Sequence, residues 1–329
     1  MRVSTFIKTG LAIFLIAVTA IMGDMVFSKE SSGATIKVKK IVFYSDRNGN
    51  DDIFMMNQDG TGLVQLTDNP ANDQDASISP DGRNIVFTSE RNGTSDLFII
   101  KGVGEVVGPD AELIIFPGSD IYDETQPDWS PNGEDIVFVS TMGGSKDIWI
   151  INLHIKSLER LTDTPYDEQG PQWSPDGKEI VYVSDRDGNR DIFLIEELPG
   201  KWGKIRQLTC EIGDDAGPSW HPKSQVGHIV YNSFWMGKSH IYEMNTDNCS
   251  CNPNEGLPDC VSNRLTWDNF YDRGPVYSPD GRNIAFSSNR LDNFDIWRMK
   301  ANGSRMQPLT IDPGYDSGPD WGRVRVPAE

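Results

Sequence analysis

Short apolar runs, broken by polar turn residues, recur at regular intervals along most of the chain. One copy reads Ile-Val-Phe-Tyr-Ser45, then a polar turn, then Asp52-Ile-Phe. Apolar runs of this length between turn residues are typical of buried β-strands, and the turn between them predicts a hairpin. Five further copies follow, each with the same eight-residue distance from a serine to an aliphatic residue. The pairs are Ser45 and Ile53, Ser89 and Leu97, Ser140 and Ile148, Ser184 and Ile192, Ser233 and Ile241, and Ser288 and Ile296.

Two other elements complete the repeat. A turn such as Ser79-Pro-Asp-Gly82 precedes each copy after the first, in one case in altered form, and a Leu-Thr pair such as Leu66-Thr67 follows most copies. Proline, Asp or Asn, and Gly are the residues that tight turns favour. One unit therefore predicts four short antiparallel strands. The units repeat every 44 to 57 residues, measured between the large residues that precede the turn: Ile78, Trp129, Trp173, Trp220, Tyr277 and Trp321.

Six such units predict an all-β fold, a six-bladed β-propeller. The first unit begins at its second strand with Ile41, and the sequence ends with an extra first strand, Gly318–Trp321. We expect this C-terminal strand to pair with the first blade, because closing the ring removes the exposed edges of a linear array. The predicted propeller spans residues 41–325 and follows a short linker at residues 31–40.

The hairpin between Ser184 and Asp191 is unusually acidic, and its three aspartates are spaced like those of a calcium loop. The equivalent hairpins of the other units mostly lack this set of acids. The segment therefore predicts a turn. Asp187-Gly188 favours a two-residue corner, which would place Ser184 opposite Asp191 in the ladder.

Residues 1–30 differ from the repeats. They carry Arg2 and Lys8, followed by a twelve-residue apolar run, Leu11–Met22. A membrane-spanning helix needs about 20 apolar residues, so the layout favours a secretory signal peptide. An uncleaved N-terminal anchor is the alternative. In either case the propeller is expected to be exported, to the periplasm or outside the cell.

The charge of the chain restricts its partners. The formal net charge is −19 and the isoelectric point is near 4.6. A surface this negative repels phosphate backbones, which argues against nucleic acid, and it favours cations or basic protein surfaces. Simple solubility is the alternative reason for the charge.

Four cysteines, Cys210, Cys249, Cys251 and Cys260, fall in one third of the sequence. An even number in an oxidising compartment predicts disulfides, with three pairings open, and one of these joins Cys249 to Cys260. A zinc site is less favoured, because Cys-Ser-Cys lacks the usual spacer between metal ligands.

Every unit carries an acidic residue just ahead of its predicted inner strand. We expect these carboxylates near the mouth of the central channel, where their combined potential would attract Ca²⁺ or a basic peptide. The alternative is a local role, in which each acid accepts backbone hydrogen bonds in its own loop. The six residues are Asp73, Glu124, Glu168, Asp215, Asp272 and Asp316.

Aromatic residues fall into two groups. Phe234 and Trp235 occupy turn positions where other copies have polar residues, so they predict a contact with a partner. The others recur at fixed positions of the repeat, which predicts packing between blades. These are Trp129, Trp173, Trp220, Phe138, Tyr182 and Trp149.

The repeat Pro-x-Trp-Ser-Pro-Asp-Gly, then Ile-x-Phe-x-Ser-x-Arg-x-Gly and Asp-Ile, resembles that of the TolB-type β-propellers, a WD40-like class. The resemblance covers about residues 41–321. It implies a six-bladed propeller that binds proteins or peptides without chemistry of its own. TolB proteins carry an additional N-terminal α/β domain, whereas only about a dozen residues separate the predicted signal from the first blade here, so the resemblance is to the propeller alone.

These features predict a non-catalytic, exported scaffold that binds a protein or peptide, most favourably a basic one, at the acidic mouth of the channel. Membrane contact is expected only through residues 1–30. The alternative is a calcium-dependent propeller hydrolase of the lactonase kind, which would hold Ca²⁺ and an acid/base pair in the channel. Such an enzyme needs unlike ligands from non-equivalent blades, whereas the six acids are equivalent by repeat.

Overall fold

The computed structural model describes residues 34–104, 111–114, 116, 121–199, 201–223, 227–247, 249, 251 and 260–328. The chain divides into two units, Met1–Ala34 and Thr35–Glu329, and all the strands below belong to the second. The predicted signal or anchor at residues 1–30 lies outside the described residues. Within the described ranges, no helix is long and apolar enough to span a membrane.

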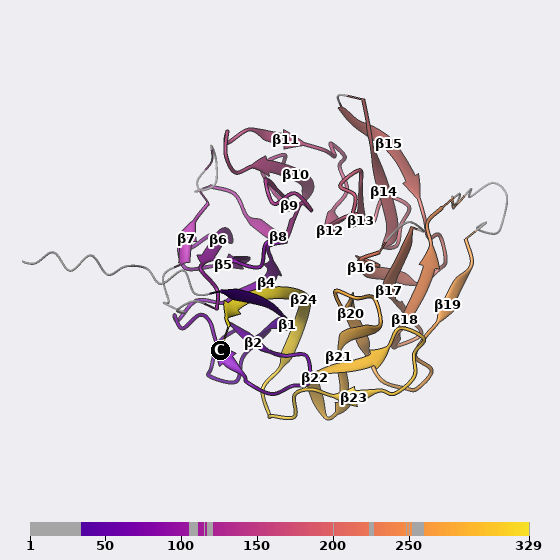
Figure 1. Cartoon of the computed structure of the whole chain (residues 1–329). Helices are drawn as coiled ribbons and strands as arrows, with labels where there is room; N and C mark the ends of the chain where they lie inside the picture. Colours follow the sequence, from indigo (N-terminus) through magenta and orange to yellow (C-terminus); the bar gives the residue numbers. More distant parts are fainter. Residues whose placement is uncertain are drawn as a thin grey trace, which may run out of the picture. The chain divides into compact units, whose positions relative to one another are not determined.

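The second unit contains six four-stranded antiparallel sheets arranged around a centre, which confirms the predicted six-bladed propeller (Figure 1). One strand of each sheet lies next to the centre. These inner strands are β4 (Asp73–Ile78), β8 (Glu124–Trp129), β12 (Glu168–Trp173), β16 (Asp214–Trp220), β20 (Asp272–Tyr277) and β24 (Asp316–Pro327). The second strands are β1 (Thr35–Ser45), β5 (Asn84–Ser89), β9 (Asp135–Ser140), β13 (Glu179–Ser184), β17 (His228–Trp235) and β21 (Asn283–Leu291).

The third and fourth strands form the outer half of each sheet. The third strands are β2 (Asp52–Asn57), β6 (Asp96–Lys101), β10 (Asp147–Asn152), β14 (Asp191–Leu198), β18 (Lys238–Asn245) and β22 (Asn293–Lys300). The outermost strands are β3 (Val64–Gln65), β7 (Ala111–Leu113), β11 (Leu158–Arg160), β15 (Lys201–Gln207), β19 (Ser262–Arg264) and β23 (Gln307–Pro308). We number the blades in chain order, so blade 1 is β24-β1-β2-β3 and blade 5 is β16-β17-β18-β19.

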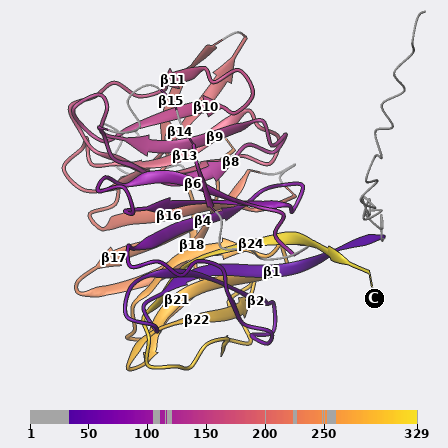
Figure 2. The same ribbon diagram turned by 90° about the vertical axis from the view of Figure 1, so that its left-hand side faces the viewer.

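Blade 1 closes the ring as predicted, because the C-terminal strand β24 is its inner strand. Trp321 lies opposite Ile41, and the ladder with β1 continues to Pro327 opposite Thr35. The two strands run on together past the other strands of the propeller (Figure 2). β1 therefore begins at Thr35, inside the segment expected to be a linker, because the end of β24 supplies a pairing partner there.

Hydrophobic side chains fill the space between neighbouring blades. Phe43 and Phe54 of blade 1, for example, pack in one cluster with Ala285 and Ile296 of blade 6. This buried contact joins the first and last blades of the sequence, so the closure rests on packing as well as on the ladder. The aromatic residues predicted to pack between blades do so: Trp129, Trp173, Trp220, Phe138, Tyr182 and Trp149.

Each inner strand contains a β-bulge where it faces the central channel. The bulged residue has a positive φ, which favours glycine, and Gly170, Gly217, Gly274 and Gly318 occupy it in four blades. The six bulges line a cavity of about 190 Å³ in the channel. The channel wall is thus made largely of Gly-Pro backbone, without the six predicted acids.

Two disulfides, Cys210–Cys251 and Cys249–Cys260, confirm that the four cysteines are paired with one another. Cys210–Cys251 ties the end of blade 4 to the connection between β18 and β19 of blade 5, and Cys249–Cys260 lies within that connection. Paired cysteines are typical of proteins that fold in an oxidising compartment.

Removing residues 318–329 should destabilise the whole propeller, because it deletes most of β24, including the buried core side chains of Trp321 and Val324. We expect a large fall in melting temperature and loss of a single cooperative transition, measured by circular dichroism. A matched chain that lacks only residues 328–329 should melt like the full chain. Equal melting of both truncated chains would show that closure by β24 is dispensable.

Candidate functional site

The six predicted acids are not gathered at one site. Each is the first or second residue of its inner strand, and all six side chains are buried. In every blade the acid lies opposite the repeated serine of the second strand, as Asp73 lies opposite Ser89. Among the described residues, no group of three His, Cys, Asp or Glu side chains is arranged to hold a metal ion. The geometry therefore gives these acids local contacts within their own blades.

Blade 2 shows what most of these contacts are. The guanidinium of Arg91 donates to both oxygens of Asp73, at 3.1 and 3.0 Å, and its Nε donates to the hydroxyl of Ser89 at 2.7 Å. The Cζ atom lies 5.5 Å from the ring centre of Phe87 and 4.4 Å from that of Phe98. We call this set of a carboxylate, a serine and two rings around one arginine the arginine clamp. It satisfies a buried carboxylate with hydrogen bonds, charge and cation–π contacts together.

Three other blades repeat the arginine clamp, with the guanidinium bound to the carboxylate and to the serine. The pairs are Arg47 with Asp316 in blade 1, Arg186 with Glu168 in blade 4, and Arg290 with Asp272 in blade 6. Two of them add a second carboxylate that lies two residues after the Leu-Thr threonine of the preceding blade. This second acid is Asp312 for Arg47 and Asp268 for Arg290.

The hairpin turn explains how the arginine reaches its carboxylate. Ser184 does lie opposite Asp191, as predicted. The two-residue corner at Asp187-Gly188 is wrong, however, because the amide of Gly188 donates to the carbonyl of Asp185 at 3.0 Å. In this four-residue turn only the glycine has a positive φ, whereas the predicted corner needs two such residues.

As a result, Arg186 stands in the first central position of the turn and its side chain returns to the blade. It donates to Ser184 at 3.0 Å and to Glu168 at 3.1 Å. The sequence signal for this contact is Ser-x-Arg at the end of the second strand. Our sequence interpretation included the motif but did not connect its arginine to the acid ahead of the inner strand.

Blade 3 departs from this pattern and fills the position differently. Met142 replaces the arginine and packs against the hydrophobic cluster between blades 2 and 3. Arg160, from the outermost strand, stacks over the ring of Trp149 with Cζ at 5.8 Å and forms an ion pair with Asp147 at 2.8 Å. Glu124 accepts a hydrogen bond from the hydroxyl of Ser140 at 3.2 Å.

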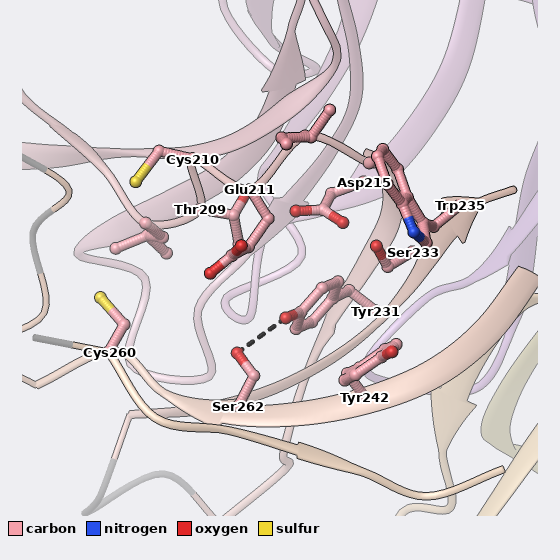
Figure 3. Close-up of a pocket in the computed structure, with 13 residues that line it drawn as sticks. Thr209, Cys210, Glu211, Asp215, Tyr231, Ser233, Trp235, Tyr242, Cys260 and Ser262 are labelled. Atoms are coloured by element: carbon pink, nitrogen blue, oxygen red, sulfur yellow. Dashed lines mark hydrogen bonds between the residues drawn. The ribbon is translucent and has the colours of Figure 1, made fainter. Parts of the chain in front are cut away.

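Blade 5 lacks the arginine and contains a cavity of about 510 Å³ in its place. The acid Asp215, the serine Ser233 and the ring pair Tyr231 and Tyr242 are all present and line this cavity. Figure 3 shows the two carboxylates, of Asp215 and Glu211, directed toward the space above Tyr231. We call this cavity the blade 5 pocket.

The hairpin of blade 5 has a different turn from that of blade 4. Here the ladder continues to Trp235 opposite Lys238, and Met236 and Gly237 both have positive φ. This is the two-residue turn that the sequence favoured elsewhere, and it extends the strands beyond Ser233. Trp235, the residue in the arginine position, lines the pocket edge and remains 46% exposed.

Asp215 is the most unusual charged group of the site. Its side chain is 1% exposed, and neither carboxylate oxygen has a hydrogen-bond partner of normal geometry among the described residues. Burial raises its pKa to about 6, while the nearby hydroxyls of Ser233 and Thr209 offset part of this rise. Burial, with the charge of Asp215, also raises the pKa of neighbouring Asp191 to about 7. Within the described chain, neither Asp215 nor Glu211 forms an ion pair with a lysine or arginine.

Two exposed apolar side chains, Ile212 and Trp235, line the blade 5 pocket, and two more, Phe234 and Met236, adjoin Trp235 in the same hairpin. The predicted contact residues Phe234 and Trp235 are among them, and the ring of Phe234 lies 5.8 Å from that of Tyr271. Met236 at the tip is 81% exposed, and Ile212 on the neighbouring loop is 78% exposed. We call Ile212, Phe234, Trp235 and Met236 the apolar rim.

The channel itself contains three acids that the sequence interpretation missed. Asp75, Asp128 and Asp320 line the central cavity, and burial raises their pKa values to about 6, about 7 and about 6 respectively. Asp128 accepts hydrogen bonds from Ser77 and from the backbone of Trp173, so it links neighbouring inner strands. They lie in or near the bulges, outside the repeated acid position, which is why the periodicity did not identify them.

The fold and the repeated strands define a six-bladed β-propeller with one open blade. A family model described as the TolB beta propeller domain matches residues 117–205. The solved structure of TolB from Acinetobacter baumannii has a TM-score of 0.69 with this chain at 18% identity, over 86% of this chain and 66% of that one. Residues 117–205 are therefore similar to the TolB beta propeller domain, and the fold of the propeller is similar to that of the solved TolB structure.

Curated relatives match over shorter segments. The chain is 48% identical over 48 residues to the Tol-Pal system protein TolB of Anaeromyxobacter dehalogenans (strain 2CP-C), which is 15% of this chain and 11% of that protein. It is 33% identical over 126 residues to the uncharacterized protein Atu1656 of Agrobacterium fabrum, which is 38% of this chain and 36% of that protein. The chain thus matches between 11% and 36% of the length of these relatives.

Replacing Asp215 by its neutral isostere, Asp215→Asn, should stabilise the protein. Because the pKa of Asp215 is raised from 3.8 to about 6, the folded state binds more protons than the unfolded state between these values, and stability falls as pH rises through them. The variant should gain on the order of 1–3 kcal/mol near pH 8, and the gain should vanish below about pH 4. Urea titrations across this range measure the difference.

The matched control is Asp73→Asn in blade 2. It leaves Arg91 partly buried without its carboxylate, so it should destabilise the protein by about 2 kcal/mol or more near pH 8. Opposite signs for the two substitutions are expected. If Asp215→Asn destabilises as Asp73→Asn does, the charge of Asp215 is compensated within the folded protein.

Proposed function

We propose that this protein is an exported, non-catalytic scaffold that binds a protein or peptide partner. The observation that carries the proposal is the apolar rim, which stands exposed beside the acidic pocket of blade 5. The equivalent turn positions of four other blades hold the arginines of the clamp, whose side chains fold back onto the blade. Exposed apolar side chains with polar groups around them are typical of protein contacts.

A basic partner suits the charge of this surface. The chain has a net charge of −19, and the pocket beside the rim adds Asp215 and Glu211. Opposite charge speeds encounter and orients the partner, whereas the apolar rim supplies contact area. Of the residues predicted from sequence, Phe234, Trp235 and Asp215 thus form the proposed contact. We assign the other five acids the local role within their blades.

Two features support export. The basic and apolar segments of residues 1–30 have the layout of a secretory signal, and the two disulfides suit an oxidising compartment. The propeller would then act in the periplasm or outside the cell.

The contacts of the six acids argue against the alternative of a calcium-dependent, lactonase-like hydrolase. A calcium site needs several carboxylate or carbonyl oxygens that are free to coordinate the ion. Four of the six repeated acids already bind an arginine of their own blade. Each is thus neutralised within its own blade, in a separate sheet.

The test is capture of partners from an envelope extract with the full-length protein as bait. The double variant Phe234→Asn/Met236→Asn removes apolar area from the rim, and asparagine tolerates the positive φ of position 236. We expect this variant to recover a stoichiometric partner at least about tenfold less well than the unsubstituted protein.

The matched control is Ile155→Asn, which removes a side chain that is 77% exposed on a turn of blade 3. It should leave recovery unchanged. Equal recovery by the rim variant and the control would exclude the rim as the contact surface. Turnover of esters or lactones by the purified protein would refute the scaffold itself.

A further inference from the structure

Blade 5 retains the receiving groups of an arginine clamp while lacking the arginine. The four filled clamps of the same chain define what this receptor binds, because each places a guanidinium against a carboxylate, a serine hydroxyl and two rings. In blade 1 the guanidinium of Arg47 donates to Asp316 at 2.7 and 2.9 Å, donates to Ser45 at 2.8 Å and lies 4.7 Å from the ring centre of Phe54. The filled clamps therefore show which contacts a guanidinium makes with these groups.

Each of these groups has a counterpart in blade 5. Asp215 lies opposite Ser233 in the ladder, as Asp316 lies opposite Ser45. Tyr231 and Tyr242 are a cross-strand pair with ring centres 5.7 Å apart, close to the 6.0 Å of the pair Phe43 and Phe54 in blade 1.

Blade 5 also has a counterpart of the second carboxylate, at the equivalent position of the repeat. In blade 1 Asp312 follows the threonine Thr310 by two residues and binds Arg47 at 2.8 Å. In blade 5 Glu211 follows Thr209 by two residues and lines the pocket. Blade 5 therefore has the two-carboxylate form of the receptor.

The pocket is large enough for a ligand, and no lysine or arginine of the described residues pairs with its buried carboxylate. Its volume of about 510 Å³ far exceeds the roughly 30 Å³ of a water molecule. Asp215 has no ion-pair partner among the described residues, and the sequence of residues 252–259, Asn-Pro-Asn-Glu-Gly-Leu-Pro-Asp, contains no lysine or arginine. A buried carboxylate left in this state is unfavourable, so a cation that enters gains from relieving it.

We propose that the blade 5 pocket binds a guanidinium group, the side chain of an arginine presented by a peptide or protein partner. Asp215 and Glu211 receive its N–H groups, Ser233 accepts a further hydrogen bond, and the planar group stacks on the rings of Tyr231 and Tyr242. For the source of the arginine, and only for that, the inference rests on the proposed scaffold function.

A guanidinium suits these groups better than an ammonium does. It is planar, so it can donate to a carboxylate with two parallel N–H groups while its face covers an aromatic ring. A lysine ammonium offers charge alone and would leave the ring faces unused. Discrimination between arginine and lysine is therefore an expected property of the pocket.

Trp235 controls access to Asp215. The carboxylate is 1% exposed, so a side chain at the pocket edge has to turn aside before a ligand reaches it. Trp235 stands at this edge and is 46% exposed (Figure 3). Shortening it should open the pocket, and an arginine in its place should fill it.

The test titrates the full-length protein with N-acetyl-arginine amide, using its lysine and citrulline counterparts as controls, by isothermal titration calorimetry at neutral pH. We expect saturable binding of the arginine compound with a Kd on the order of 1 mM. The lysine compound should bind at least about tenfold more weakly, and the neutral citrulline compound should not bind. Equal binding of all three, or none by the arginine compound, would overturn the proposal.

Substitutions locate the binding. Asp215→Asn should weaken it at least about tenfold, and Trp235→Ala should strengthen it. Trp235→Arg should abolish it and raise the melting temperature, because the clamp is then filled from within. Arg91→Ala in blade 2 should create a second guanidinium site that is absent from the unsubstituted protein. Binding that is indifferent to Asp215→Asn would refute the pocket as the site.

The source of the arginine is a separate arm of the same test. The small compound binds the isolated protein without any partner, so its failure refutes the pocket and leaves the scaffold proposal standing. Loss of partner capture by Phe234→Asn/Met236→Asn with unchanged binding of the arginine compound identifies the rim as the contact and the pocket as an independent site. Loss of partner capture by Asp215→Asn with the rim intact shows that the partner supplies the arginine.

Discussion

A carboxylate buried at the start of every inner strand is the constraint on which the chemistry of each blade depends. A buried charge is tolerated only where hydrogen bonds and an opposite charge compensate its lost hydration. In blades 1, 2 and 4 the tight turn after the second strand returns an arginine to the carboxylate. In blade 6 Arg290 reaches the carboxylate from within the longer strand β21.

Because the six blades share this arrangement, the arginine position can be compared between them. Blade 3 fills the arginine position with Met142, and Arg160 enters from another strand. Blade 5 extends its hairpin by two residue pairs, which carries Trp235 to the pocket edge and leaves Asp215 uncompensated. The need to compensate a buried carboxylate thus accounts for the four blades with an arginine clamp. The same need explains why the carboxylate of blade 5 favours a ligand.

The sequence predicted the blades, their number and the closure by the last strand, because these follow from apolar periodicity and from turn residues that are local in the chain. The pairing of Arg91 with Asp73 was missed, since the two residues lie 18 positions apart and meet only through the geometry of the turn. The pocket of blade 5 was missed for a related reason. Its signal is Trp235 at the position where four other units have arginine. That difference can be interpreted only when the contact of the arginine with the carboxylate is known.

Function in a repeat protein is expected where the repeat breaks. Six equivalent acids distribute charge evenly around the ring and give no single partner a place to bind. The replacement of one arginine concentrates an uncompensated carboxylate, a cavity and an exposed apolar rim in one blade. These three features meet at the hairpin between β17 and β18, where Trp235 takes the position of the arginine, so one local difference in the repeat separates a structural contact from the proposed binding site.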